Sequence, residues 1–104
     1  MKQHKRYTER NDLKGASHLE VSVYYTKGGA NYFCGGTIQR GYYVSVTPVT
    51  KKGGTISFEL FAGCKRFLFA ANRYTDKQFQ RAIEMAKDYE DELITVAVAE
   101  NKAA

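Results

Sequence analysis

Residues 40–63 (RGYYVSVTPVTKKGGTISFELFAG) constrain the fold more than any other part of the chain. Residues 42–47 place Tyr, Val and Val on one face, and residues 55–60 place Ile, Phe and Leu on one face. This alternation predicts two half-buried strands, because successive side chains of a strand point to opposite faces. The linker KKGG holds two glycines, which reach the positive φ that a tight hairpin turn requires. The stretch therefore predicts a central hairpin.

Two other stretches predict strands before this hairpin. Residues 19–26 alternate in the same way, with Leu, Val, Val and Tyr on the apolar face. Residues 27–31 (KGGAN) predict a turn, and residues 32–34 predict a short strand that returns beside the first.

Residues 1–17 are polar, basic and without a pattern. They are predicted to form a flexible basic arm, because they bury too little apolar surface to offset the entropy of ordering.

After residue 63 the apolar spacing changes from that of a strand to that of a helix. One face of a short helix would carry Cys64, Phe67, Leu68 and Ala71. Thr75 and Gln78 fit a capping box, which predicts the start of a longer helix. Residues 93–99 alternate as a strand would, yet they also extend the helical stripe, and period alone does not separate the two. The absence of glycine and proline favours a continued helix.

These patterns together predict an α+β fold. An antiparallel meander of three to four strands is followed by one or two C-terminal helices packed on one face. Residues 18–100 are expected to form a single domain, since 104 residues bury enough surface for one core. The predicted core consists of Leu19, Val21, Val23, Val44, Val46, Ile56, Phe58, Leu60, Phe67, Leu68, Phe79 and Ile83.

The charge of the chain is unevenly distributed. The net charge is +5, but residues 1–81 hold 14 Lys and Arg against 5 Asp and Glu, and residues 82–104 hold 2 against 6. A basic body with an acidic end suits a polyanionic partner on one side of the molecule. An uneven but merely solvating surface explains the same counts.

The sequence offers no pattern for membrane insertion or secretion. The chain has no run of about 18 apolar residues, so no membrane span is expected. Its first 15 residues, MKQHKRYTERNDLKG, lack the apolar segment of a secretion signal. These observations predict a cytoplasmic protein, in which Cys34 and Cys64 stay reduced.

No motif for catalysis or metal binding is evident. His4, His18, Cys34 and Cys64 occur singly, whereas zinc sites usually show closely spaced ligand pairs. No nucleophile elbow and no phosphate-binding loop occurs in the sequence. The protein is therefore expected not to be an enzyme, with no cofactor, no metal and no small-molecule substrate.

Aromatic residues stand among basic ones in the predicted strands. In the pairs Tyr24-Tyr25 and Tyr42-Tyr43, one ring must point inward and the other outward. Outward rings on a sheet with a basic rim are typical of domains that bind single-stranded DNA or RNA. The predicted contacts are Tyr24, Tyr43, Arg40, Lys51, Lys52, Lys65 and Arg66.

Two alternatives account for the same residues. Tyrosine is a favoured strand residue, and cross-strand Tyr pairs stabilise a sheet without any ligand. An exposed strand edge also recruits other chains. The protein is thus predicted to be a nucleic-acid binder or, alternatively, a protein-interaction module that forms a homodimer or binds another partner.

The motifs YTKGGANYF, GGTIQRGYYVSVTPV and FAGCKRFL resemble a family of short uncharacterised basic proteins common in gut-anaerobe genomes, often near mobile elements. The resemblance covers roughly residues 19–95 and implies no activity. A curved meander followed by a helix is also similar in architecture to the PUR and PC4-like single-strand nucleic-acid binders. This second likeness implies the same class of ligand by analogy alone.

Overall fold

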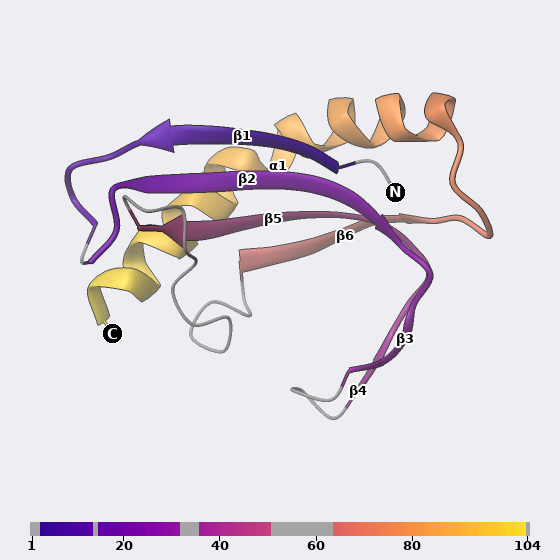
Figure 1. Ribbon diagram of the computed structural model, residues 1–104, viewed down its shortest axis with the longest axis horizontal. Coiled ribbons are helices and arrows are strands. Elements are labelled where there is room, and N and C mark those ends of the chain that lie inside the picture. Colours follow the sequence, from indigo (N-terminus) through magenta and orange to yellow (C-terminus); the bar gives the residue numbers. More distant parts are fainter. Residues whose placement is uncertain (1–2, 14, 32–35, 51–63, 104) are drawn as a thin grey trace.

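The protein folds into an antiparallel sheet with one long helix across a single face (Figure 1). A computed structural model describes residues 3–13, 15–31, 36–50 and 64–103. The four-stranded sheet has the order β1-β2-β5-β6. Its strands are β1 (Gln3–Glu9), β2 (His18–Thr26), β5 (Gly41–Val49) and β6 (Lys65–Ala70). A two-stranded ribbon of β3 (Gly29–Asn31) and β4 (Gly36–Ile38) projects from it, and α1 spans Asp76–Ala103. The predicted α+β fold is confirmed.

The centre of the sheet is the pair β2–β5. The two strands are antiparallel along nine residues, and the pairs Val21–Val46, Val23–Val44 and Tyr25–Tyr42 place the apolar side chains on one face. All six of these side chains are buried, as is Leu19. The alternation read in residues 19–26 and 42–47 is thereby confirmed. The second half of the predicted hairpin, residues 51–60, lies outside the described residues, as does the short strand predicted at residues 32–34.

The outer neighbour of β5 is a strand where the spacing predicted a short helix. Residues 65–70 form β6, and Tyr42 and Tyr43 pair with Phe69 and Phe67, which leaves Leu68 as an extra residue between them. Short apolar runs fit either period, and here β6 gains backbone hydrogen bonds from β5. The bulge turns Phe67 away from the helix, so Phe67 is 37% exposed rather than part of the core.

The expectation of a flexible N-terminal arm is wrong for residues 3–9. These residues form β1, which pairs with β2 along its whole length. An edge strand draws its stability from ladder hydrogen bonds and needs few apolar side chains, so the lack of an apolar pattern did not preclude it. Ion pairs also hold β1 in place. Lys5 Nζ lies 3.3 Å from Glu20 Oε1 of β2, and Arg6 is paired with Glu90 of α1.

The helix begins at the predicted cap. The backbone N–H of Gln78 donates to Thr75 Oγ1 at 3.2 Å, which is one half of the predicted capping box. In the other half the Tyr42 hydroxyl stands between the partners, because it accepts the Thr75 N–H and donates to Gln78 Oε1. The helix then runs to residue 103, so residues 93–99 are helical. Its buried face consists of Phe79, Ala82, Ala86, Leu93 and Ala97. No helix among the described residues has the length and apolar character needed to cross a bilayer.

Two buried tyrosines fasten the start of the helix to the sheet. Tyr42, which is fully buried, directs its hydroxyl proton at Gln78 Oε1 (3.2 Å) and the Thr75 carbonyl (3.3 Å). The same hydroxyl accepts the backbone N–H of Thr75 at 3.1 Å. Tyr25 donates to the carbonyl of Ala71 at 3.2 Å. These contacts anchor the start of α1 and the segment before it to the sheet face that carries the apolar side chains of β2 and β5.

Gly41 provides a test of the close approach between β5 and β6. Its φ is +155°, and a Cβ at this position would lie 2.4 Å from the Phe69 carbonyl oxygen. Gly41→Ala is therefore expected to lower the free energy of unfolding by about 3 kcal/mol, measured by urea denaturation. Gly15→Ala is the matched control, because Gly15 also has positive φ (+73°) but open space around it. It is expected to cost only about 1 kcal/mol, and equal losses would contradict the packing argument.

Candidate functional site

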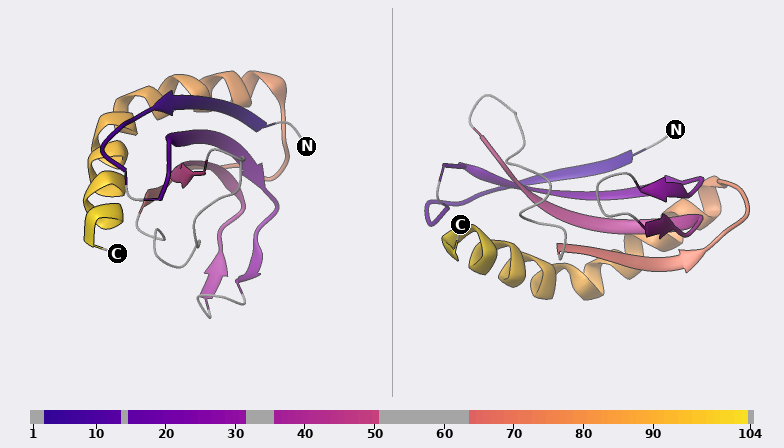
Figure 2. Two further views of the ribbon diagram at one scale, coloured as in Figure 1. Left: turned by 60° about the vertical axis from the view of Figure 1, so that its left-hand side comes forward. Right: turned by 90° about the horizontal axis from the view of Figure 1, so that it is seen from below.

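The sheet face opposite α1 is the candidate site, and we call it the helix-free face. Figure 2 shows that α1 runs along one side of the sheet only. Because side chains alternate along a strand, the neighbours of the buried core residues point to the other side. The helix-free face therefore carries residues such as Lys5, Ser22, Tyr24, Tyr43 and Lys65.

Aromatic rings cross this face in a single row. The strand registers align Gln3 with Tyr24, Tyr24 with Tyr43, and Tyr43 with Phe67. The rings of Tyr24 and Tyr43 stack at 5.8 Å with an interplanar angle of 16°. Phe67 meets Tyr43 edge-on, with ring centroids 5.2 Å apart. We call Tyr24, Tyr43 and Phe67 the aromatic row.

A second row with basic ends lies directly beside the first. The same registers align Lys5, Ser22, Ser45 and Lys65 across the four strands. Lys65 Nζ lies 4.9 Å from the centroid of the Tyr43 ring, and Lys5 Nζ lies 3.3 Å from Glu20. We call these four residues the basic row. Because the two rows are two residues apart along each of the three strands that they share, β2, β5 and β6, about 7 Å separates them there.

The rings of the aromatic row differ in accessibility. Tyr43 is only 7% exposed, because Tyr24, Phe67 and Lys65 surround it, so the expectation that its ring is open to solvent is wrong. Its hydroxyl donates to the Gln39 carbonyl at 2.7 Å. Tyr24 is half-buried, and Phe67 is the more open ring. Tyr43 thus supports its neighbours, and they offer the accessible aromatic surface.

The structure separates the predicted basic residues. Arg40 lies beyond the strand end, where it donates from Nε to the Lys27 carbonyl (3.0 Å) and from Nη1 to the Asn72 carbonyl (3.3 Å). It joins two chain segments and lies outside both rows.

Arg66 faces the helix side. Its guanidinium lies 4.0 Å from the centroid of the Tyr89 ring, and its Nη1 lies 3.5 Å from Glu92. Lys51 and Lys52 lie outside the described residues. Of the seven predicted contacts, the structure gathers Tyr24, Tyr43 and Lys65.

Phe67 and Lys5 are members of the rows that the sequence analysis missed. Phe67 was predicted to be helical and buried, and Lys5 was predicted to lie in a flexible arm. Residues 3–9 (QHKRYTE) show no apolar alternation, so the sequence carries no signal for this edge strand. The bulge that positions Phe67 has no such signal in the sequence.

The tyrosines of the site are neutral phenols at physiological pH. Burial, and then the neighbouring Tyr43, raise the pKa of Tyr24 to about 12. Burial also raises the pKa of Tyr43. Neither side chain is therefore suited to act as a general base, and both remain available for uncharged stacking.

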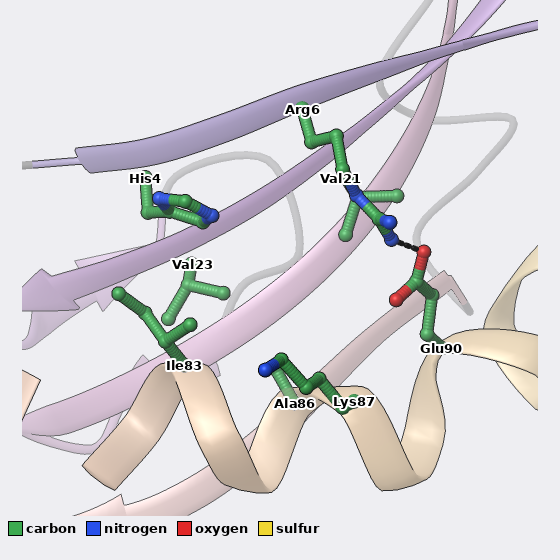
Figure 3. A pocket seen from close by; sticks show the side chains of 8 residues that line it. All are labelled: His4, Arg6, Val21, Val23, Ile83, Ala86, Lys87 and Glu90. Carbon is green, nitrogen blue, oxygen red and sulfur yellow. Dashed lines mark ion pairs between the residues drawn. The ribbon is translucent and has the colours of Figure 1, made fainter. Parts of the chain in front are cut away.

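A separate pocket of about 320 Å³ lies between β1, β2 and α1 on the opposite face (Figure 3). Its floor consists of Val21, Val23, Ile83 and Ala86, and its rim of His4, Arg6, Lys87 and Glu90. Arg6 is paired with Glu90, as Figure 3 shows, and Lys87 Nζ lies 3.3 Å from Glu84. The charges at its rim are therefore largely compensated within the protein.

The described residues show no arrangement for metal or thiol chemistry. In the described ranges, no three His, Cys, Asp or Glu side chains gather as metal ligands would. Cys64 is buried and its Sγ lies 3.6 Å from Glu100 Oε2. Burial, together with the charge of Glu100, raises the pKa of the thiol to about 12, so it is not a thiolate nucleophile.

Comparison of the chain with protein-family models, curated protein sequences and solved structures finds no match. The likeness of residues 19–95 to a family of short basic proteins therefore stays a prediction. The geometry of the two rows is the observation from which a function has to be argued.

The raised pKa of Tyr24 makes stability depend on pH in alkaline solution. An unfolded tyrosine titrates near pH 10, whereas the folded group titrates near 12. The unfolded state therefore releases its proton first, and the free energy of unfolding is expected to fall by about 1–3 kcal/mol as pH rises from 10 to 12. Tyr24→Phe should remove this part of the decline, measured by urea denaturation at several pH values. A wild-type decline that Tyr24→Phe leaves unchanged would contradict the assignment.

Proposed function

We propose that the protein binds single-stranded nucleic acid on its helix-free face, without catalysing a reaction on it. The observation that carries this proposal is the alignment of the aromatic row beside the basic row. Rings and cations that share one surface match the two parts of a nucleotide, because bases stack on rings and phosphates attract lysines.

The aromatic row offers two stacking positions. Phe67 is 37% exposed and Tyr24 is half-buried, while Tyr43 between them fixes their spacing through ring contacts. A base stacked on an aromatic side chain contributes about 1–3 kcal/mol and is accepted whatever its identity. The rings therefore favour binding with little sequence preference.

The basic row lies where the phosphates would run. With about 7 Å between the rows, a nucleotide whose base rests on Phe67 directs its phosphate toward Lys65. Ser45, which is partly exposed, adds a hydroxyl that can donate to a phosphate oxygen. Lys5 lies on the same line across β1, but its charge is engaged by Glu20, so Lys65 is the lysine of this row that we expect to meet the phosphates.

The shape of the face favours single strands over a duplex. Bases of a duplex are stacked on one another and present only their edges in the grooves, which proteins usually read with an inserted helix or ribbon. The helix-free face instead presents the aromatic row across three of its four paired strands. Unpaired bases can lie on such a surface, and the net charge of +5 attracts the phosphate backbone of the nucleic acid.

Removing the most open ring tests the stacking contribution. Phe67→Ala is expected to weaken binding of a fluorescein-labelled oligothymidine by about 5- to 100-fold, because one stacking contact is lost. Fluorescence polarisation at low salt measures the change. Phe67→Tyr keeps a ring at this position and should bind within about twofold of wild type. An Ala variant that binds as tightly as the Tyr variant would contradict the proposal.

Removing a lysine tests how much the contact between lysine and phosphate contributes to binding. Lys65→Gln should reduce the slope of log K against log salt concentration by about 0.7, the value for one phosphate contact on a single strand. Lys77→Gln removes the same charge from an exposed position in the first turn of α1, and it should leave the slope unchanged. Wild-type protein that fails to bind at low salt, or binds independently of salt, would overturn the proposal.

A further inference from the structure

We infer that β1 is the interface of a two-fold symmetric homodimer, in which two copies join edge to edge into one eight-stranded sheet. β1 stands at the end of the strand order, and among the described residues no strand pairs with its outer side (Figure 1). The outward N–H and C=O groups of such an edge are able to pair with another strand. The occupant we propose is a second copy of this chain.

Symmetry restricts how two copies of β1 can pair. A two-fold axis that relates two adjacent antiparallel strands is perpendicular to the sheet, so the residue at the centre faces its own copy. Centring the pair on Lys5 or Arg6 would place two like charges directly opposite, which is unfavourable. Centring it on Thr8 would leave only about three residues of β1 in register. Tyr7 is the centre that avoids both problems.

The register centred on Tyr7 is complementary in charge. Lys5, whose Nζ also lies 3.3 Å from Glu20 Oε1 of its own protomer, then lies opposite the partner subunit's Glu9. The symmetry repeats this pair on the other side of the axis. Opposite charges directly across a strand pair are stabilising. Glu9 is exposed, and no residue in the described part of the chain forms an ion pair with it.

The remaining side chains of β1 fit the same register. Tyr7 is 56% exposed, which is unusual for so large an apolar ring, and pairing with its copy would cover it. Arg6 would lie opposite the partner subunit's Thr8, and its charge is already countered by Glu90 of its own protomer. The register therefore leaves no unpaired charge facing a like charge.

The dimer would also enlarge the helix-free face. Because the axis is perpendicular to the sheet, both helices lie on one side and both helix-free faces on the other. Two copies of the aromatic row and the basic row would then share one continuous surface, with the Tyr7 pair between them. Five paired residues on each strand make a small interface, so we expect association that depends on concentration in the micromolar range or above.

A disulfide across the axis tests the register. Residues opposite one another in an antiparallel pair have Cα atoms about 4.5–5.5 Å apart, within the range that a disulfide spans. Tyr7→Cys, in a chain with Cys34→Ser, is expected to form a covalent dimer on mild oxidation. Phe67→Cys in the same background is the control, since it lies on the same face at the opposite edge. If Tyr7→Cys dimerises no faster than Phe67→Cys, the inference is overturned.

Charge exchange tests the Lys5–Glu9 contact by sedimentation equilibrium of the full chain. Glu9→Lys is expected to raise the dimer dissociation constant about tenfold, because it replaces two attractive contacts with two repulsive ones. Both the single variant and the double variant Lys5→Glu with Glu9→Lys are made together with Glu20→Gln, because Glu20 otherwise faces residue 5 within the same protomer. The double variant then restores opposite charges and should return within about threefold of the chain that carries Glu20→Gln alone. A wild-type chain that stays monomeric up to about 1 mM, far above the expected range, or a double variant weaker than the single one, would overturn the inference. Thermal melting of each variant confirms that it is folded, and none of these measurements depends on nucleic-acid binding.

Discussion

The hydroxyl group of Tyr42 is the contact on which the arrangement of this protein depends. It is fully buried in the central pair of strands, and it joins the sheet to the cap of α1 through Thr75 and Gln78. A buried hydroxyl without partners would be costly, so the helix has to begin where those partners are supplied. From that first turn, the apolar side chains of α1 pack along the apolar side chains of β2 and β5, which keeps the helix on one face.

Because α1 packs on one face of the sheet, the other face has no helix. The neighbouring tyrosines show this difference between the two faces, because Tyr25 and Tyr42 point into the core while Tyr24 and Tyr43 point away from it. Since β2 and β5 are paired in register over nine residues, the outward side chains line up as rows. The proposed ligand surface is thus a by-product of the way in which the core is closed.

The two edges of the sheet complete this surface in different ways. At β6 a bulge allows Phe69 to pack beside Tyr42 and Phe67 to pack beside Tyr43, so one strand serves both faces. At β1 the strand carries few apolar side chains and is held by ion pairs to Glu20 and Glu90. An edge stabilised in this way can remain exposed in a monomer or accept a second strand.

The sequence by itself determined the elements whose period is unambiguous. The alternation of Leu19 to Tyr25 and of Tyr42 to Val46 identified β2 and β5, and the cap at Thr75 identified the start of α1, because these signals are local. Tertiary structure alone decided that residues 3–9 and 65–70 are strands, since each is stabilised by pairing with a neighbour distant in the chain. It also decided the cross-strand registers, and with them the neighbours of Tyr24 and Lys65 on the helix-free face. Local patterns assign side chains to faces, but only pairing between strands aligns them into rows.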